Sequence, residues 1–250
     1  MKRTIIIFSL MICLLLSGCL FTPPQPTEAV TEPVFPTLPA TEPAPETEPP
    51  TEAETEPVAT LPTMDLADTD FVKVSDYIPD IAVDLRYATE NNFTGQVIYR
   101  FSQPYLRFGT VKKLIQVQNE LRESGYCLLI WDGFRPVSAQ FRLWEICPDS
   151  TYVANPYAGY SAHSRGNTVD ITIVEADGSP VEMPTEFDDF SVLADRNYTD
   201  CTPEAAINAK MLQEIMEHCG FQGYYGEWWH YTDTNSYPVE TEFDPSSEMP

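Results

Sequence analysis

A segment rich in proline, threonine and glutamate, residues 20–64, most constrains how this chain can fold. It carries no Lys or Arg, and Thr-Glu-Pro begins at positions 31, 41, 47 and 55. Without apolar periodicity, nothing offsets the entropy of ordering it, so we expect an extended tether. At about 3.1 Å per residue it could span up to roughly 140 Å. A proline-rich ligand for another module is the alternative interpretation.

The first residues have the pattern of an export signal. Lys2 and Arg3 precede an apolar run, residues 5–16, which ends at Leu16-Ser17-Gly18-Cys19. This predicts a signal peptide at 1–18. A membrane-spanning anchor is the alternative, but it needs about 20 apolar residues. Leu-Ser-Gly-Cys resembles the lipobox of bacterial lipoproteins. The resemblance implies that Cys19 is lipidated and that residues 19–64 tether the protein to the extracytoplasmic face of the cell membrane.

The charge of the chain excludes two classes of partner. Against 38 Asp+Glu there are only 14 Lys+Arg, a formal net charge of -24. Phosphate binding needs clustered basic side chains, so a nucleic-acid partner is not expected. Electrostatic docking on anionic lipid is disfavoured for the same reason.

The dense apolar runs after the tether predict one domain at 65–235, followed by a loose acidic tail at 236–250. Strand-like alternation or short apolar runs predict five strands, at residues 71–74, 81–87, 126–131, 169–174 and 228–232. Helical spacing or helix-start signals predict helices at residues 111–124, 136–144 and 203–218, the last capped by Thr202. This mixture predicts an α+β fold, a small antiparallel sheet with flanking helices, rather than a βαβ repeat.

Four cysteines of the predicted domain could form disulfides if the protein is exported: Cys127, Cys147, Cys201 and Cys219. If residues 203–218 form one helix, Cys201 and Cys219 lie roughly 20 Å or more apart, beyond disulfide reach. Cys201 should therefore pair with Cys127 or Cys147, or stay free.

Polar residues inside apolar surroundings predict a metal site. His163 lies in a polar loop, and Asp170 is the only charge in the strand-like run that follows. Glu227 precedes His230 by three residues, with two tryptophans between them. Two histidines and an aspartate can bind zinc and leave one position open for water. The alternative is a loop histidine at 163 and a satisfied core histidine at 230, while His218 fits a structural role at a helix end.

Six motifs in order, over roughly residues 70–233, carry a resemblance to a known family. They are Asp84-Leu85-Arg86-Tyr87-Ala88-Thr89, Asn92-Phe93-Thr94-Gly95, Trp131-Asp132-Gly133-Phe134-Arg135-Pro136, Ser161-x-His163-Ser164-Arg165-Gly166, Phe187-Asp188 and Glu227-Trp228-Trp229-His230. Together they resemble the D-alanyl-D-alanine dipeptidases of the VanX type, zinc peptidases related to the D,D-carboxypeptidases. The resemblance implies a single zinc-peptidase domain.

The resemblance also implies a metal set and a catalytic pair. One Zn²⁺ per chain would be bound by His163, Asp170 and His230. Glu227 would be the general base, and Arg135 would stabilise the anion formed on the substrate carbonyl. A structural salt bridge, for example with Asp132, is the alternative role for Arg135.

The substrate contacts follow from the same resemblance. Asp188 and Tyr87 would bind the substrate ammonium group, and Ser161 would help to seat the carboxylate. The Phe-Asp motif favours Asp188 over the adjacent Asp189.

The predicted export signal separates this chain from the best-known dipeptidases of this type, which act in the cytoplasm. The first hypothesis is an exported enzyme that hydrolyses D-Ala-D-Ala. The second is a D,D-carboxypeptidase or endopeptidase that trims peptidoglycan peptides. A binding module with an inactive site is a third, disfavoured by the complete set of ligands, base and arginine.

Overall fold

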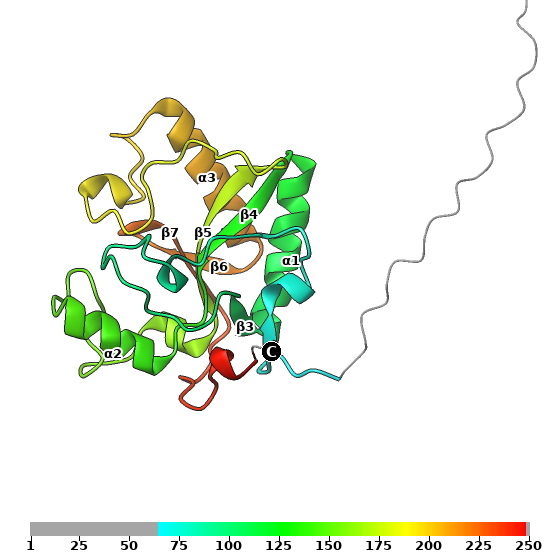
Figure 1. Cartoon of the computed structure of the whole chain (residues 1–250). Helices are drawn as coiled ribbons and strands as arrows, with labels where there is room; N and C mark the ends of the chain where they lie inside the picture. Colours follow the sequence, from blue (N-terminus) through cyan, green and yellow to red (C-terminus); the bar gives the residue numbers. More distant parts are fainter. Residues whose placement is uncertain (1–64, 249–250) are drawn as a thin grey trace, which may run out of the picture. The chain divides into compact units, whose positions relative to one another are not determined.

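The computed structural model describes residues 65–248, which form an α+β arrangement around one five-stranded sheet (Figure 1). The strand order is β2-β4-β5-β7-β6. The strands are β2 (Ala82–Val83), β4 (Tyr126–Asp132), β5 (Thr168–Glu175), β6 (Phe221–Tyr224) and β7 (Glu227–Asp233). Neighbours pair antiparallel except β2 and β4, which are parallel. The α+β class is confirmed, and the antiparallel sheet gains one short parallel strand at its edge.

Strand β5 is the centre of the sheet, with β4 on one side and β7 on the other. Every residue of β5 except Glu175 is buried. Both faces of the strand are therefore covered, with Val169, Ile171 and Ile173 on one face and Thr168, Asp170 and Thr172 on the other. Asp170 is therefore a carboxylate held inside the core of the domain.

Two long helices pack on the sheet, and a third helix lies away from them (Figure 1). Helix α1 (Phe108–Glu123) contacts β4, while α3 (Pro203–His218) contacts β6, β7 and α1. Buried apolar residues of α1 recur every three or four positions, so they form one face against the core. The expected cap of α3 is confirmed, because the Thr202 hydroxyl accepts from the Ala205 amide at 3.1 Å.

Several expected boundaries were wrong. The strand expected at 81–87 is only β2, and a 3₁₀ turn follows at Arg86–Ala88. That turn buries the Tyr87 side chain. Helix α1 begins three residues earlier than expected, and α2 (Val137–Ile146) starts after Pro136 and runs past 144.

Strands β3 and β6 were not expected from the sequence. Strand β3 (Tyr105–Arg107) pairs with β1 (Phe71–Lys73) in a separate two-stranded sheet. Strand β6 pairs antiparallel with β7. Both are short, at three and four residues, so neither shows a clear alternation.

The C-terminal segment, which was expected to be a loose tail, packs on the domain in the part that the structure describes. That part ends at residue 248. Tyr237 is buried, and Phe243 stacks on Phe71 with ring centroids 4.4 Å apart. Glu240 forms an ion pair with Arg107 of β3 at 3.2 Å. The expectation of a loose tail was therefore wrong, because aromatic side chains in this acidic stretch bury against the domain.

The predicted helix at 203–218 is confirmed as α3, so Cys201 and Cys219 lie at its opposite ends. Within residues 65–248, all four cysteines are free thiols. No helix in that same range is long and apolar enough to cross a membrane. The signal peptide at 1–18, Cys19 and the tether at 19–64 lie outside the described residues and stay predictions.

Candidate active site

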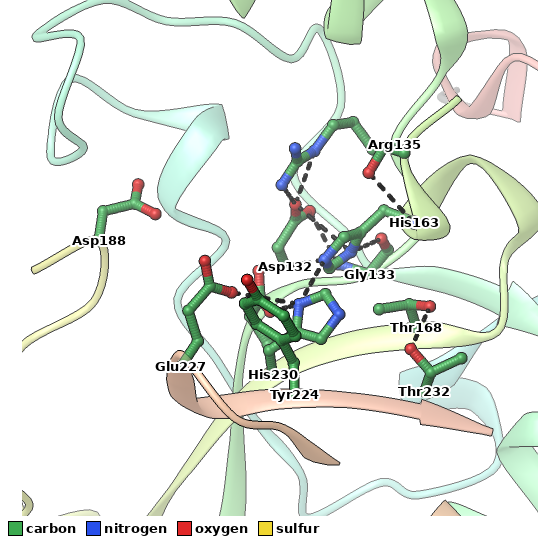
Figure 2. Close-up of polar contacts among 12 residues, drawn as sticks. Asp132, Gly133, Arg135, His163, Thr168, Asp188, Tyr224, Glu227, His230 and Thr232 are labelled. Carbon is green, nitrogen blue, oxygen red and sulfur yellow. Dashed lines mark hydrogen bonds and ion pairs between the residues drawn. The ribbon is translucent and has the colours of Figure 1, made fainter. Parts of the chain in front are cut away.

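Three candidate metal ligands from separate parts of the sequence meet beside the central strands. Asp170 of β5 and His230 of β7 are direct partners in the antiparallel register. His163 comes from the 3₁₀ turn at Ala162–Arg165 that precedes β5. Asp170 Oδ1 lies 3.0 Å from His230 Nδ1, and Asp170 Oδ2 lies 3.3 Å from His163 Nε2. The two imidazole nitrogens are 3.4 Å apart (Figure 2).

The turn that carries His163 is fixed by local contacts. The Ser161 hydroxyl accepts from the His163 amide at 3.3 Å, and the turn ends at Gly166 with φ 74°. A Cβ at Gly166 would come within 2.4 Å of the Phe71 ring, so glycine is required by both conformation and space. His163 Nδ1 lies 2.8 Å from the Gly133 carbonyl (Figure 2). Nδ1 therefore carries the proton, and Nε2 is free to bind a metal.

The charges in this cluster suit a bound cation. Asp170 is only 3% exposed. Burial alone would raise its pKa, but the imidazoles of His163 and His230 outweigh burial and hold that pKa below its usual range. Burial would lower the pKa of His163, yet Asp170 raises it. All three donor atoms lie within 4.8 Å of one another, and a two-histidine, one-carboxylate set suits zinc with an open position. These residues therefore fit a bound zinc ion.

Glu227 begins β7 and lies next to the metal ligands. Its Oε2 is 3.5 Å from His230 Nδ1. Burial raises the pKa of Glu227, and the negative charge of Asp170 raises it further against the opposing effect of His230. A carboxylate with a raised pKa beside a metal-bound water is suited to accept a proton.

Arg135 is held in place by Asp132, the residue that we considered as its partner in a structural salt bridge. Its Nε and Nη2 donate to Asp132 Oδ2 at 3.1 and 2.7 Å (Figure 2). Its Nη1 donates to Gln140 at 3.0 Å. Tyr99 and the Gly133 amide donate to the other oxygen of Asp132. The salt bridge is therefore real, and it orients a guanidinium that also lines the cavity described next.

All eight residues expected at the site line one cavity of about 280 Å³. They are Tyr87, Arg135, Ser161, His163, Asp170, Asp188, Glu227 and His230. A larger hollow of about 660 Å³ beside α2 contains none of these groups. The structure thus brings the predicted residues together, although their individual roles are not fixed by proximity.

Asp188 and Tyr87 form a second polar pair in the cavity. The Tyr87 hydroxyl donates to Asp188 Oδ2 at 2.9 Å. In Figure 2, Asp188 stands apart from the ligands, with Glu227 between them. Burial, followed by the charge of Asp170, raises the pKa of Asp188 to about 8. Its φ of 56° is unusual for a residue other than glycine and marks local strain at this point.

Sequence reasoning named Asp132 as a partner of Arg135, but it missed the aromatic walls of the cavity and Gln140, the second partner of Arg135. Tyr152, Phe190 and Tyr224 also line the cavity, and Tyr152 packs on Phe190 with ring centroids 4.6 Å apart. Aromatic residues in loops give no periodic signal that could have identified them. Asp132 did carry a signal, a lone acid at the end of an apolar strand-like run.

A family profile described as D-ala-D-ala dipeptidase (Peptidase M15) matches residues 67–245. The chain belongs to this family. A D-alanyl-D-alanine dipeptidase of Escherichia coli K12 is 34% identical over 173 residues, which cover 68% of this chain and 89% of the relative. One of Streptomyces coelicolor is 32% identical over 195 residues, with 70% and 96% covered. The chain is thus a hydrolase of the zinc metallopeptidase class.

Similarity to solved structures is lower. The vancomycin resistance D,D-pentapeptidase VanY in complex with Zn(II) has 16% identity and a TM-score of 0.36, over 55% of this chain and 77% of that chain. VanYB in complex with D-alanine-D-alanine has 18% identity and a TM-score of 0.35, over 60% and 79%. The family assignment rests on the sequence matches.

Proposed function

We propose that this enzyme hydrolyses D-alanyl-D-alanine and that the cavity accepts the dipeptide with a free ammonium group. The main support for the proposal is that one small cavity holds two different groups of polar side chains. His163, Asp170 and His230 lie in one part, and the Asp188–Tyr87 pair lies apart from them. A dipeptide has a scissile peptide bond, on which the first group could act, and an ammonium group, which the second group could bind.

In the proposed mechanism His163, Asp170 and His230 would hold the zinc, which would supply Lewis acidity at the reacting carbonyl. Glu227 accepts the proton of the attacking water and then delivers it to the leaving amine. The guanidinium of Arg135 faces the developing anion, and the Asp132 contacts hold it in place without reorganisation.

The remaining groups orient the substrate. Asp188 and Tyr87 bind the ammonium group, and the Ser161 hydroxyl helps to seat the carboxylate. Asp188 is half-buried and burial raises its pKa, so an ionised carboxylate there is stabilised by a cationic partner. A longer peptide would present a neutral amide instead, which supports a preference for the free dipeptide.

The test compares free D-Ala-D-Ala with its N-acetyl form and with a pentapeptide that ends in D-Ala-D-Ala. Loss of one partner of a buried charge pair costs about 3 kcal/mol or more, so we expect kcat/KM to fall more than about a hundredfold on acetylation. Asp188→Asn is the matched control, because without the carboxylate the two substrates should differ much less. Equal or faster cleavage of the acylated substrates would instead support a D,D-carboxypeptidase or endopeptidase.

The metal assignment is tested separately from the substrate. His163→Ala removes one of three ligands, so we expect the purified variant to lose its active-site zinc and its activity. His218→Ala, outside the cavity, is the control for activity. Full zinc occupancy of the active site in the His163 variant, measured by metal analysis together with turnover, would remove His163 from the ligand set.

We also propose that the enzyme acts outside the cytoplasmic membrane, anchored through Cys19. The support is the basic start, the apolar run and the Leu16-Ser17-Gly18-Cys19 sequence. Mass spectrometry of the mature protein should find a diacylated N-terminal cysteine. Recovery of the intact first 18 residues, or an unmodified Cys19, would contradict this location.

A further inference from the structure

A second group of metal-binding side chains lies outside the cavity, where α1 meets the end of α3. Glu120 belongs to α1, His218 is the last residue of α3, and Cys219 is its C-cap. None of them lines the active-site cavity. Because α1 and α3 pack against each other, the three donors are presented by two helices rather than by a mobile loop.

The spacing of the donor atoms suits a tetrahedral metal ion. His218 Nδ1 lies 3.2 Å from Glu120 Oε1 and 3.3 Å from Oε2, and Cys219 Sγ lies 3.4 Å from Oε1. Ligands at about 2.0–2.3 Å from zinc lie roughly 3.3–3.8 Å apart along the edges of the tetrahedron. The donors of the active-site cluster are separated by similar distances, from 3.0 to 3.4 Å.

The chemistry of the three donors favours a transition metal over magnesium or calcium. Thiolate and imidazole are ligands that zinc and cobalt prefer, whereas hard cations prefer oxygen alone. Cys219 is only 7% exposed, while the His218 side chain is 77% exposed. A bound ion would therefore be held from the protein side and would keep a position open to water.

The charge state of the cluster leaves room for a cation. The Cys219 thiol donates to the Glu120 carboxylate, and burial together with that carboxylate raises the pKa of the thiol to about 11, so the thiol keeps its proton. A metal ion would take the place of that proton. Lys113 is close by, against Gly220, but its amine is already held by Asp233.

We propose that Glu120, His218 and Cys219 bind a second ion of the zinc class, which links α1 to α3. This site is separate from catalysis, and its occupancy stabilises the folded state by mass action. It is independent of the proposed substrate, because it shares no residue with the cavity.

Cobalt(II) distinguishes the two sites, because only the second has a sulfur ligand. We would add Co(II), under reducing conditions, to the enzyme that already contains one zinc per chain. A near-ultraviolet thiolate-to-cobalt charge-transfer band should appear, and thermal unfolding should shift to higher temperature. Cys219→Ser should lose both effects and keep dipeptidase activity.

Two further variants make the result decisive. His218→Ala changes an exposed side chain, so it should fold normally and bind Co(II) more weakly at this site. Cys201→Ser removes a half-buried cysteine at the other end of α3 and should keep the band. Absence of the band in the parent enzyme at saturating Co(II), or an unchanged band in Cys219→Ser, would overturn the proposal.

Discussion

Replacing Asp188 by Asn should make the enzyme more stable at alkaline pH and less active. The folded-state pKa of this carboxyl is raised to about 8, chiefly by burial, whereas an unfolded aspartate has a pKa of about 3.9. Between these values the folded state binds more protons than the unfolded state. The free energy of unfolding contributed by Asp188 therefore falls as the pH rises from about 4 to about 8.

The magnitude follows from the size of the shift. One pKa unit corresponds to about 1.36 kcal/mol, so the full shift would correspond to about 5 kcal/mol. The residue is only half-buried, and zinc next to Asp170 would cancel part of the repulsion that raises this pKa. We therefore expect about 1–3 kcal/mol, after discounting for exposure. Asparagine cannot ionise, yet its carbonyl can still accept from Tyr87.

The assay is urea unfolding of the zinc-loaded parent and variant at pH 5 and pH 8. The variant should exceed the parent in stability by a larger margin at pH 8 than at pH 5. Asp189→Asn, at the neighbouring position, is the control and should leave the pH dependence unchanged. If Asp188→Asn loses as much stability as the parent between pH 5 and pH 8, the carboxyl is not held against ionisation and the reasoning fails. Dipeptide turnover should also fall, because the ammonium group loses its charged partner.

The other predictions concern the base, the arginine's partner and the hairpin that carries the ligands. Glu227→Gln should retain zinc and lose about 10²- to 10⁴-fold in kcat, and near-normal turnover of the loaded variant would require another base. Asp132→Ala leaves a buried guanidinium without its ion partner and should lower the free energy of unfolding by about 3–5 kcal/mol. Glu145→Ala, which breaks the exposed pair with Arg142, should cost about 1 kcal/mol or less, and equal losses in urea unfolding would contradict the difference. Arg196→Ala removes a donor to the His230 carbonyl at 2.9 Å, so zinc should be lost to a chelator at a concentration about 10- to 100-fold lower, and an unchanged titration would exclude a positioning role.

The sequence predicted the site better than it predicted the fold that assembles it. Asp170 and His230 are about 60 residues apart, and only the β5–β7 register makes them neighbours. No periodicity in either segment specifies that pairing, because sheet order depends on how the whole chain packs. The motifs could be assigned to one site because they resemble a family, while spacing alone left a loop histidine and a core histidine as alternatives.

Features that depend on distant packing escaped prediction. The strand pattern at 81–87 was broken by a 3₁₀ turn, which brings Tyr87 to Asp188 across about 100 residues of sequence. Acidic composition suggested a loose C-terminal tail, yet Phe243 and Tyr237 find aromatic and buried surroundings. Arg196 gave no signal in the sequence, although its guanidinium contacts the carbonyls of Tyr224 and His230. In each case the contacts of a few side chains determined the local structure, and the average composition or periodicity of the segment did not predict them.

The acidic and basic side chains around the cavity are linked by the balance of their charges. Asp132, Asp170 and Glu227, when ionised, face one permanent cation, Arg135, which leaves two negative charges in a region of low water access. Such an excess is costly to bury, and one divalent ion cancels it. Burial still raises the pKa of Asp188 and so favours its neutral form until an ammonium group arrives. An ionised Asp188 without a partner lowers the stability of the folded state. When a cationic substrate occupies the cavity, the same carboxylate gains a partner, so substrate binding compensates its charge.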